Sequence, residues 1–289
     1  MTQIESKNYE ELAYEFPEIW EEDWFSLDDH DRIRHISELI PADTKTIADI
    51  GCGNGLFLNF LMSSTSKSFE RLAGVDRSQA ALSHVRTEKH RGSIDALPFH
   101  DREFDTVTCM EVLEHLSVNT FPHAVEELSR VARRYLLISV PYRQDLNASL
   151  STCPSCCTRF NADFHVRTFD EAKLSGLFEH HGFRQIRSLY LGESIVYPDQ
   201  ELRKRLKKLL LQLPPSGFPS YAVCPVCGFH DRAKLQSDLA HRKLSADRTR
   251  TSANLRQSSR ERGSLMRTLL SKFLPGRIQY HWICALYER

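Results

Sequence analysis

The chain has 289 residues, and its 38 lysine and arginine residues balance 38 aspartate and glutamate residues. That length suits one large α/β domain with an appendage, or two small domains. No stretch approaches 18 uninterrupted apolar residues, and the acidic N-terminus carries no apolar run. We therefore expect neither a transmembrane helix nor a secretory signal. The neutral total also argues against a chain built to coat nucleic acid.

The two signs of charge are segregated along the chain. Residues 1–31 hold eleven acidic residues against one lysine, whereas residues 200–277 hold seventeen basic residues against five acidic ones. Such segregation is typical of a specialised tail or insertion. We expect the acidic segment and the basic segment to be in contact.

Predicted strands and helices alternate between residues 46 and 141. Apolar runs predict strands at 46–50, 72–75, a short one ending at Asp95-Ala96, and then 104–112, 135–140, 183–191 and 278–287. Helical periodicity and capping residues predict helices within 5–40, from Leu56, and at 78–86, 119–134 and 169–181. This alternation predicts an α/β fold with a parallel, doubly wound sheet.

Residues 193–276 break this alternation and are interpreted as an insertion before the last strand. The insertion carries basic amphipathic stretches at 201–213 and 265–274, and a polar run at 237–262 that we expect to be a flexible linker. The predicted organisation is therefore a helical lead-in and lid over 1–40 and a core over 41–192. The insertion over 193–276 and the last core strand over 277–289 complete it.

A glycine-rich loop, Asp49-Ile50-Gly51-Cys52-Gly53-Asn54-Gly55, joins the first predicted strand to its helix. Glycines permit a tight turn and a close approach of the backbone to a ligand. The spacing differs from the G-x-G-x-x-G pattern of dinucleotide-binding folds, and Asp49 would repel a pyrophosphate. An acid at this position suits a ligand with an ammonium group. Asp76 ends the next strand, where ribose hydroxyls would be held.

Together with Ile94–Phe99 and Met110–Leu116, this loop resembles class I S-adenosylmethionine-dependent methyltransferases of the small-molecule group (methyltransferase type 11) that includes ubiquinone-biosynthesis O-methyltransferases. The resemblance covers about 46–142. It implies a seven-stranded, mostly parallel, Rossmann-like sheet and S-adenosylmethionine as the cofactor. The cofactor-binding residues that it implies are Asp49, Gly51, Cys52, Gly53, Asp76, Arg77, Asp95, Ala96, Met110 and Glu111.

Methyl transfer requires a general base if the acceptor must lose a proton early. Glu114 and His115 are the candidates, because they directly follow the fourth predicted strand. The alternative is that they cap the next segment and orient the loop. A further alternative joins Glu111, Glu114, His115 and His165, which are similar to the divalent-metal site of small-RNA 2′-O-methyltransferases.

Two Cys-Pro-x-Cys pairs, Cys153/Cys156 and Cys224/Cys227, are typical of zinc knuckles. We expect the four thiolates to hold one structural Zn²⁺ that attaches the insertion to the rim of the sheet. The alternatives are a Cys153–Cys156–His165 set, a redox pair, or unrelated thiols. Cys52, Cys109 and Cys284 lie in apolar contexts and are interpreted as packing residues.

These features predict a methyltransferase acting on an oxygen of a small-molecule or lipid- or sugar-linked acceptor. The alternatives are an RNA methyltransferase that binds RNA through the zinc element and the basic insertion, and a non-catalytic interaction module. We expect a cytoplasmic protein, with peripheral contact to the inner membrane surface through the basic insertion as an option. The sequence does not indicate the acceptor or the oligomeric state.

Overall fold

The computed structural model of the protein describes residues 9–21, 27–64, 67–196, 218–251 and 277–289. A seven-stranded sheet of order β3-β2-β1-β4-β5-β11-β8 forms its centre. The strands are β1 (Thr46–Ile50), β2 (Arg71–Asp76), β3 (Glu88–Arg91), β4 (Phe104–Met110), β5 (Ala132–Pro141), β8 (Arg184–Leu191) and β11 (Trp282–Glu288). β11 runs antiparallel to β5 and β8, and the other neighbours are parallel. The predicted doubly wound, mostly parallel α/β sheet is confirmed.

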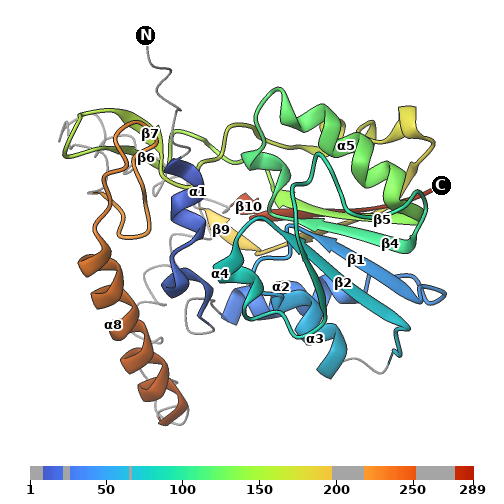
Figure 1. Ribbon diagram of the computed structural model, residues 1–289, viewed down its shortest axis with the longest axis horizontal. Coiled ribbons are helices and arrows are strands. Elements are labelled where there is room, and N and C mark those ends of the chain that lie inside the picture. The colour runs from blue at the N-terminus through green and yellow to red at the C-terminus, as the bar shows by residue number, and fades with distance from the viewer. Residues whose placement is uncertain (1–8, 22–26, 65–66, 197–217, 252–276) are drawn as a thin grey trace.

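Helices cover both faces of the sheet (Figure 1). α5 (Thr120–Val131) and α6 (Glu171–Ser175) pack on one face, and α2 (Leu27–Ser37) and α3 (Leu56–Ser64) pack on the other. α5 buries Ala124, Val125 and Leu128 because three- and four-residue spacing places them on one side of the helix. The central strands are largely buried, since both of their faces are covered, and Asp49 and Thr108 are among their few buried polar residues.

The strand order reverses between β1 and β4, which are direct neighbours in the sheet. The chain runs from β1 outward to β2 and β3, and then returns to the other side of β1 as β4. The connections at the carboxyl ends of β1 and β4 therefore diverge, and open α/β sheets bind ligands in the resulting crevice. This topology places the glycine-rich loop beside residues 111–115.

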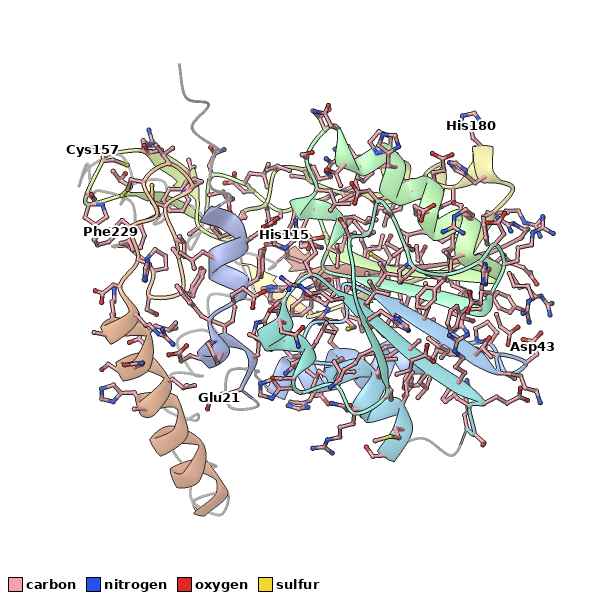
Figure 2. The ribbon with its side chains drawn as sticks, viewed as in Figure 1. Glu21, Asp43, His115, Cys157, His180 and Phe229 are labelled. Carbon is pink, nitrogen blue, oxygen red and sulfur yellow. The ribbon has the colours of Figure 1, made fainter. Side chains whose placement is uncertain are left out.

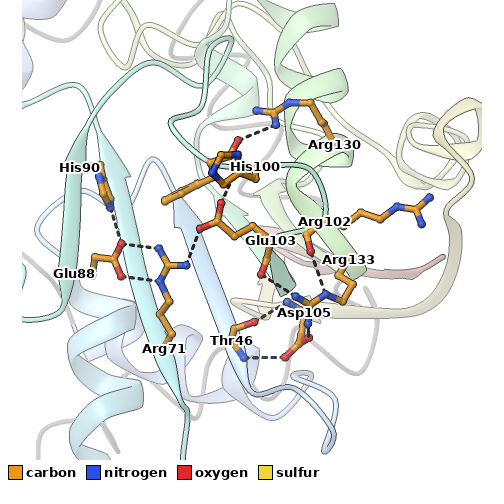
Figure 3. A network of polar contacts seen from close by, with 11 residues as sticks. Thr46, Arg71, Glu88, His90, His100, Arg102, Glu103, Asp105, Arg130 and Arg133 are labelled. Atoms are coloured by element: carbon orange, nitrogen blue, oxygen red, sulfur yellow. Dashed lines mark hydrogen bonds and ion pairs between the residues drawn. The ribbon is translucent and has the colours of Figure 1, made fainter.

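An ion-pair network joins β2, β3 and β4 at the amino ends of these strands (Figure 3). Arg71 donates two hydrogen bonds to Glu88 and one to Glu103, each of 2.7 Å. The bidentate contact with Arg71 lowers the pKa of Glu88 to about 2. Arg133 donates to Asp105 at 2.8 Å in the same network. Because it lies away from the crevice, we assign this network a structural role.

The N-terminal segment consists of separate short helices. α1 (Tyr9–Tyr14) and a 3₁₀ helix, η1 (Pro17–Trp20), precede α2. Pro17 begins η1, where its missing N–H is not needed. We call residues 9–21 the N-terminal cover, because they lie across the carboxyl ends of the strands.

Several predicted boundaries are wrong. β3 ends at Arg91, and the expected strand end at Asp95-Ala96 is a turn closed by a single bridge between Ser93 and Ala96. α4 covers Gln79–Leu82 and does not reach residue 86. The helix expected over 169–181 is α6 followed by η4 (Glu179–His181), which Gly182 ends in a left-handed conformation. The last apolar run is divided into β10 (Arg277–Gln279) and β11.

The predicted insertion lies at the end of an antiparallel ladder. β9 (Ser194–Val196) pairs with β10, and Val196 lies opposite Arg277. The expectation of a flexible linker from residue 237 is wrong over its described part, because α8 (Arg232–Thr251) is helical there. The amphipathic stretches at 201–213 and 265–274 lie outside the described residues. Within the described part of the chain, none of the helices has the length and apolar character that crossing a bilayer requires.

A small second unit lies at one end of the molecule (Figure 1). It contains the hairpin β6 (Leu150–Thr152) and β7 (Arg159–Asn161), against which residues 218–231 pack. We call residues 150–166 and 218–231 the cysteine module. Its centre is apolar, with Cys153, Phe160, Ala162, Ala222 and Cys224 buried together.

Candidate active site

A cavity of about 1160 Å³ lies at the carboxyl ends of β1, β2 and β4. Its size exceeds that of most small-ligand sites, so a nucleoside with a long substituent can be accommodated. The N-terminal cover and α2 complete its wall. The predicted site residues that line it are Asp49, Gly51, Cys52, Gly53, Asp76, Arg77, Met110, Glu111 and His115.

Two glycines of the loop are required by its geometry. Gly51 has φ +74°, and a Cβ there would lie 2.3 Å from a methyl of Val112. Gly53 has φ +52°, and a Cβ there would lie 2.9 Å from the ring of Trp20. The left-handed conformation and the close neighbours both exclude a side chain. Val112 and Trp20 therefore pack directly against the loop, which also lines the cavity.

Asp49 provides a buried carboxylate at the floor of the cavity. Its side chain is 2% exposed and accepts a hydrogen bond of 2.6 Å from Thr108. Burial raises its pKa to about 7, and the nearby Asp76 adds to this effect. A cationic ligand group beside Asp49 would favour the ionised form, because opposite charges lower the pKa of a carboxyl group.

Asp76 links the glycine-rich loop to the start of α4. One carboxylate oxygen accepts from the Gly53 amide and the other from the Ser78 amide, each at 2.8 Å. Burial raises the pKa of Asp76, although these two amides oppose the effect. Each carboxylate oxygen has a second lone pair that can accept from a ligand hydroxyl.

Arg32 enters the same cavity from α2 and was missed by the sequence interpretation. Its side chain is 12% exposed, and its Nη1 lies 3.2 Å from Oε1 of Glu111. Nε and Nη1 are nonetheless buried without a well-formed hydrogen bond. Buried donors of this kind usually have a partner, so a ligand acceptor is expected there. The available signal was that Arg32 is the first arginine of the chain and directly follows a strongly acidic segment.

Glu111 is held by structural contacts. Its backbone has φ +56°, a conformation that non-glycine residues rarely adopt. Its carboxylate accepts from Ser139 at 2.9 Å and from the indole of Trp282 at 3.0 Å. Strained backbone of this kind concentrates at functional sites. Glu111 positions Arg32 and closes this side of the cavity.

Glu114, His115 and His165 form a second cluster, behind the loop that follows β4. Their ligand atoms lie within 4.8 Å of one another. Glu114 is fully buried, and neither of its carboxylate oxygens has a hydrogen-bond partner. His115 contacts the Tyr14 hydroxyl at 3.2 Å, and burial lowers the pKa of His115 to about 3. Glu111 does not join this group, so the four residues considered together in the sequence fall into two sets.

The four knuckle cysteines meet in the cysteine module. Cys153 Sγ lies 3.6 Å from Cys227 Sγ, and Cys156 Sγ lies 3.5 Å from Cys224 Sγ. A tetrahedral zinc site with Zn–S bonds of about 2.3 Å places its sulfur atoms about 3.8 Å apart. Hydrogen bonds from Thr158 lower the pKa of Cys156 to about 6, which favours a thiolate. His165 belongs to the Glu114 cluster and lies outside this group.

The two knuckles have matching backbone geometry. The Cys157 amide donates to the Cys153 carbonyl, and the Gly228 amide donates to the Cys224 carbonyl, each at 2.9 Å. Cys157 and Gly228 both adopt left-handed conformations, with φ of 61° and 70°. The segments near residues 153 and 224 therefore fold into the same turn, as a shared metal would require. In Figure 2, His115 lies between the sheet and the part of the module that carries Cys157 and Phe229.

Residues 48–136 match a family model described as a methyltransferase domain. This segment is a class I methyltransferase domain. The methyltransferase domain is similar to a ubiquinone biosynthesis O-methyltransferase of Hydrogenovibrio crunogenus, with 34% identity over 95 residues. That alignment covers 29% of this chain and 38% of the relative. A probable S-adenosylmethionine-dependent methyltransferase of Mycolicibacterium smegmatis is 30% identical over 146 residues, which cover 48% of this chain and 52% of the relative.

The chain thus spans between about two fifths and half of the length of these curated relatives. Among solved structures, a S-adenosylmethionine-dependent methyltransferase from Archaeoglobus fulgidus aligns with a TM-score of 0.49 and 14% identity, over 90% of this chain and 94% of that one. A methyltransferase from Haloferax volcanii, solved with the Trm112 methyltransferase activator, aligns with a TM-score of 0.47 and 18% identity. This alignment covers 65% of this chain and 79% of that one.

Two predicted cofactor residues of the methyltransferase domain lie outside the cavity lining. Asp95 and Ala96 are exposed on the turn after β3, whereas Ser93 and Ile94 line the cavity. Asp95 accepts a hydrogen bond from the Ser93 hydroxyl, so it orders the turn that Ser93 and Ile94 share. Contact of Asp95 and Ala96 with an adenine ring stays a prediction.

Proposed function

We propose that the protein is an S-adenosylmethionine-dependent methyltransferase that methylates an oxygen of a small-molecule or lipid- or sugar-linked acceptor. One observation carries this proposal. A buried carboxylate, Asp49, and a guanidinium with unused donors, Arg32, line the same cavity. The methionine end of the cofactor carries an ammonium and a carboxylate, which match these two groups in charge. The similarity to ubiquinone biosynthesis O-methyltransferases favours oxygen as the acceptor atom.

The chain's own residues fit the rest of this cofactor. The hydroxyls of a ribose suit Asp76, because each of its carboxylate oxygens keeps an unused lone pair. Gly51 and Gly53 both line the cavity, so a ligand there can contact the loop backbone. When bound, S-adenosylmethionine supplies an electrophilic methyl group on a sulfonium.

The protein's main task in such a transfer is alignment, because the reaction is an in-line displacement. The Thr108 hydroxyl fixes Asp49, and the amides of Gly53 and Ser78 fix Asp76. Trp20 lies against Gly53 and contributes to the cavity wall, so the N-terminal cover shields this side from water. Shielding strengthens the electrostatic interactions inside the cavity.

The cluster of Glu114, His115 and His165 provides the polar groups that would receive the acceptor hydroxyl. Proton transfer to a neutral imidazole is one role for this cluster. The same three ligand atoms lie close enough to hold a divalent cation, and the unpartnered oxygens of Glu114 support this alternative. Activity measured after chelation separates the two roles. Loss of activity that Mn²⁺ or Mg²⁺ restores would favour the cation, whereas unchanged activity would favour proton transfer.

We also propose a structural Zn²⁺ bound by Cys153, Cys156, Cys224 and Cys227. The support is the meeting of four sulfur atoms at distances close to those of a tetrahedral thiolate site. Four thiolates leave no open position for catalysis, so the metal would act on stability. It would hold residues 218–231 against the β6–β7 hairpin.

The test of the proposed activity is calorimetric titration of the full chain with S-adenosylmethionine and S-adenosylhomocysteine. We expect one site per chain, with at least tenfold weaker binding in Asp76→Ala. Thermal unfolding of the variant controls for misfolding, because Asp76 also orders the loop. Binding that is absent, or that is unchanged in Asp76→Ala, would contradict the proposal and favour a non-catalytic interaction module.

A further inference from the structure

A second cavity of about 450 Å³ adjoins the first, and the proposed function does not account for it. The two cavities share Tyr14 and His115. The second cavity therefore begins where the first ends, at the loop after β4. An acceptor that reaches a methyl group in the first cavity must approach from an adjoining space of this kind, because the two reacting atoms must come within about 3–3.5 Å.

The walls of the second cavity are aromatic and apolar. Tyr14, Phe164 and Tyr221 line it together with three small or aliphatic side chains, Ala13, Ile19 and Ala162. The rings of Tyr14 and Phe164 lie 6.4 Å apart at a tilt of 50°. Aromatic walls bind the faces of ring-shaped ligands.

The charged residues that line the second cavity disfavour anionic ligands. Among the described residues, the lining includes no lysine or arginine, and it carries the carboxyl groups of Asp29 and Asp163. Asp29 lies 3.7 Å from Arg32, which belongs to the first cavity. A phosphate or carboxylate in the second cavity would therefore face acidic groups without a cation of its own. This charge pattern argues against phosphorylated acceptors, RNA included.

The polar end of the second cavity is formed by His115 and His165, whose rings lie 4.5 Å apart. Nδ1 of His165 contacts Oε1 of Gln144, which can only accept, so this nitrogen carries the proton. Nε2 of His165 then keeps its lone pair and lies 4.0 Å from Oε1 of Glu114. A ligand hydroxyl at this end would find a hydrogen-bond acceptor in Nε2.

Much of the outer wall comes from the cysteine module. Ala162, Asp163 and Phe164 follow β7, and Tyr221 precedes the second knuckle. The Tyr221 hydroxyl donates to Asp163 at 2.7 Å and joins the two halves of the module at the cavity. The module is therefore placed to select the ligand as well as to support the fold.

We infer that the second cavity is the acceptor site, and that it takes an uncharged ring compound with a free hydroxyl, either a phenol or a glycoside. This inference rests on the proposed function. The acceptor oxygen forms a bond to the methyl carbon while the carbon–sulfur bond of the donor breaks. The sulfur keeps the electron pair, and the hydroxyl proton is released to solvent water. Methylated acceptor and S-adenosylhomocysteine result.

The test uses the full chain saturated with S-adenosylhomocysteine and ligand-detected NMR. The neutral probes are catechol and methyl α-glucopyranoside, and their anionic counterparts are 3,4-dihydroxybenzoate and glucose 6-phosphate. We expect at least one neutral probe to bind at millimolar concentration, about tenfold more tightly than its counterpart. The probe that binds distinguishes a phenol from a glycoside. Failure of both neutral probes, or tighter binding of the anions, would overturn the inference.

Variants of the module locate the bound probe. Phe164→Ala removes one aromatic wall, and Phe164→Leu keeps apolar volume in case the first variant unfolds. We expect either variant to weaken probe binding about fivefold or more, with S-adenosylhomocysteine affinity and thermal midpoint close to wild type. Asp163→Asn should reduce the discrimination against the anionic probes. Unchanged probe affinity in both Phe164 variants would reject the acceptor site and leave the proposed activity intact. Failure of the wild-type protein to bind S-adenosylhomocysteine would instead reject the proposed activity.

Discussion

Glu18 of the N-terminal cover accepts a hydrogen bond of 3.1 Å from Nε of Arg232, at the start of α8. Gln236 donates to the same oxygen at 3.1 Å. Phe16 packs beside this pair against Val223 of the cysteine module. The acidic and basic segments of the chain are thus in contact here, as their charge asymmetry led us to expect. The cover is held from one side by the module and α8, and from the other by the glycine-rich loop.

Loosening this attachment should weaken cofactor binding. We expect Glu18→Gln and Arg232→Met each to raise the dissociation constant of S-adenosylhomocysteine about threefold, because a partly exposed ion pair contributes at most about 1 kcal/mol. In a double-mutant cycle, the second substitution should add little to the first. Calorimetry provides the measurement. Lys45→Met is the control, since it removes an exposed ion pair with Glu70 far from the cover.

The four-cysteine cluster should contain one zinc ion in the purified protein. We expect Cys153→Ser and Cys224→Ser to reduce bound zinc to near zero and to lower the unfolding temperature by several degrees, because the metal joins two distant segments. Cys157→Gly is the matched control. Cys157 neighbours Cys156 but has φ 61°, so glycine should retain zinc and relieve about 1 kcal/mol of backbone strain. A zinc-free wild type that chelators do not destabilise would contradict this prediction.

The affinity for S-adenosylhomocysteine should increase as the pH rises towards 7. Asp49 must be ionised to bind an ammonium, and burial raises its pKa to about 7. Well below that pH, each unit of acidification should weaken binding about tenfold. The folding stability of the unliganded protein should show the opposite pH dependence. The unfolded state releases this proton near the ordinary pKa, so the raised folded pKa makes stability fall as the pH rises towards 7. Asp49→Asn should flatten both profiles, and a pH-independent wild type would contradict this assignment.

Arg32 should recognise the carboxylate end of the cofactor. We expect Arg32→Met to weaken S-adenosylhomocysteine binding by about tenfold or more, as lost charge-assisted hydrogen bonds typically do. Arg32→Lys should be intermediate, because a lysine cannot present two donors in one plane. The matched ligand control is methylthioadenosine, which lacks the amino-acid end and should bind all three proteins equally. Equal losses for both ligands would indicate a general disturbance of the cavity.

The ion-pair network of Figure 3 should contribute to stability without affecting binding. Arg71 joins β3 and the residue before β4 through Glu88 and Glu103. We expect Arg71→Met to lower the free energy of unfolding by about 1–2 kcal/mol, since the contact is bidentate but partly exposed. Urea denaturation measures the effect. Arg34→Met, which removes exposed pairs on α2, should change stability by less than about 0.5 kcal/mol.

The central sheet could be predicted from the sequence because its strands are nearly continuous apolar runs between helices of clear periodicity. α8 could not be predicted, since its composition is polar and its packing depends on contacts far away in the chain. Leu235 and Leu239 are buried, and Glu18 lies beside the first turn. The breaks between the short helices of the N-terminal cover could not be predicted either. Aromatic residues recur throughout that segment, so the sequence pattern does not mark where one helix ends and the next begins.

Site residues at the ends of strands were easier to infer from the sequence than site residues from distant parts of the chain. Asp49 and Gly51 lie in the glycine-rich segment, Asp76 ends the next strand, and the structure places all three on the cavity. Arg32 reaches the same cavity from α2, and Trp282 of β11 donates to Glu111 of the lining, and no local pattern marks either of them. The repeated Cys-Pro-x-Cys spacing suggested that two distant segments meet, but it carried no information about the cavity that their meeting encloses.

The ladder between β9 and β10 has a consequence for how the segment between these two strands could vary among related chains. Val196 pairs with Arg277 in this ladder, so the points where the chain leaves the methyltransferase domain and returns to it lie side by side. We therefore expect that a segment of different length can replace residues 197–276 without shifting the register of β8 against β11. Tyr221 and the second cysteine knuckle belong to the segment between β9 and β10, whereas the glycine-rich loop lies outside it. Under the proposed function, replacement of this segment would change acceptor preference and leave the cofactor-binding residues of the loop unchanged.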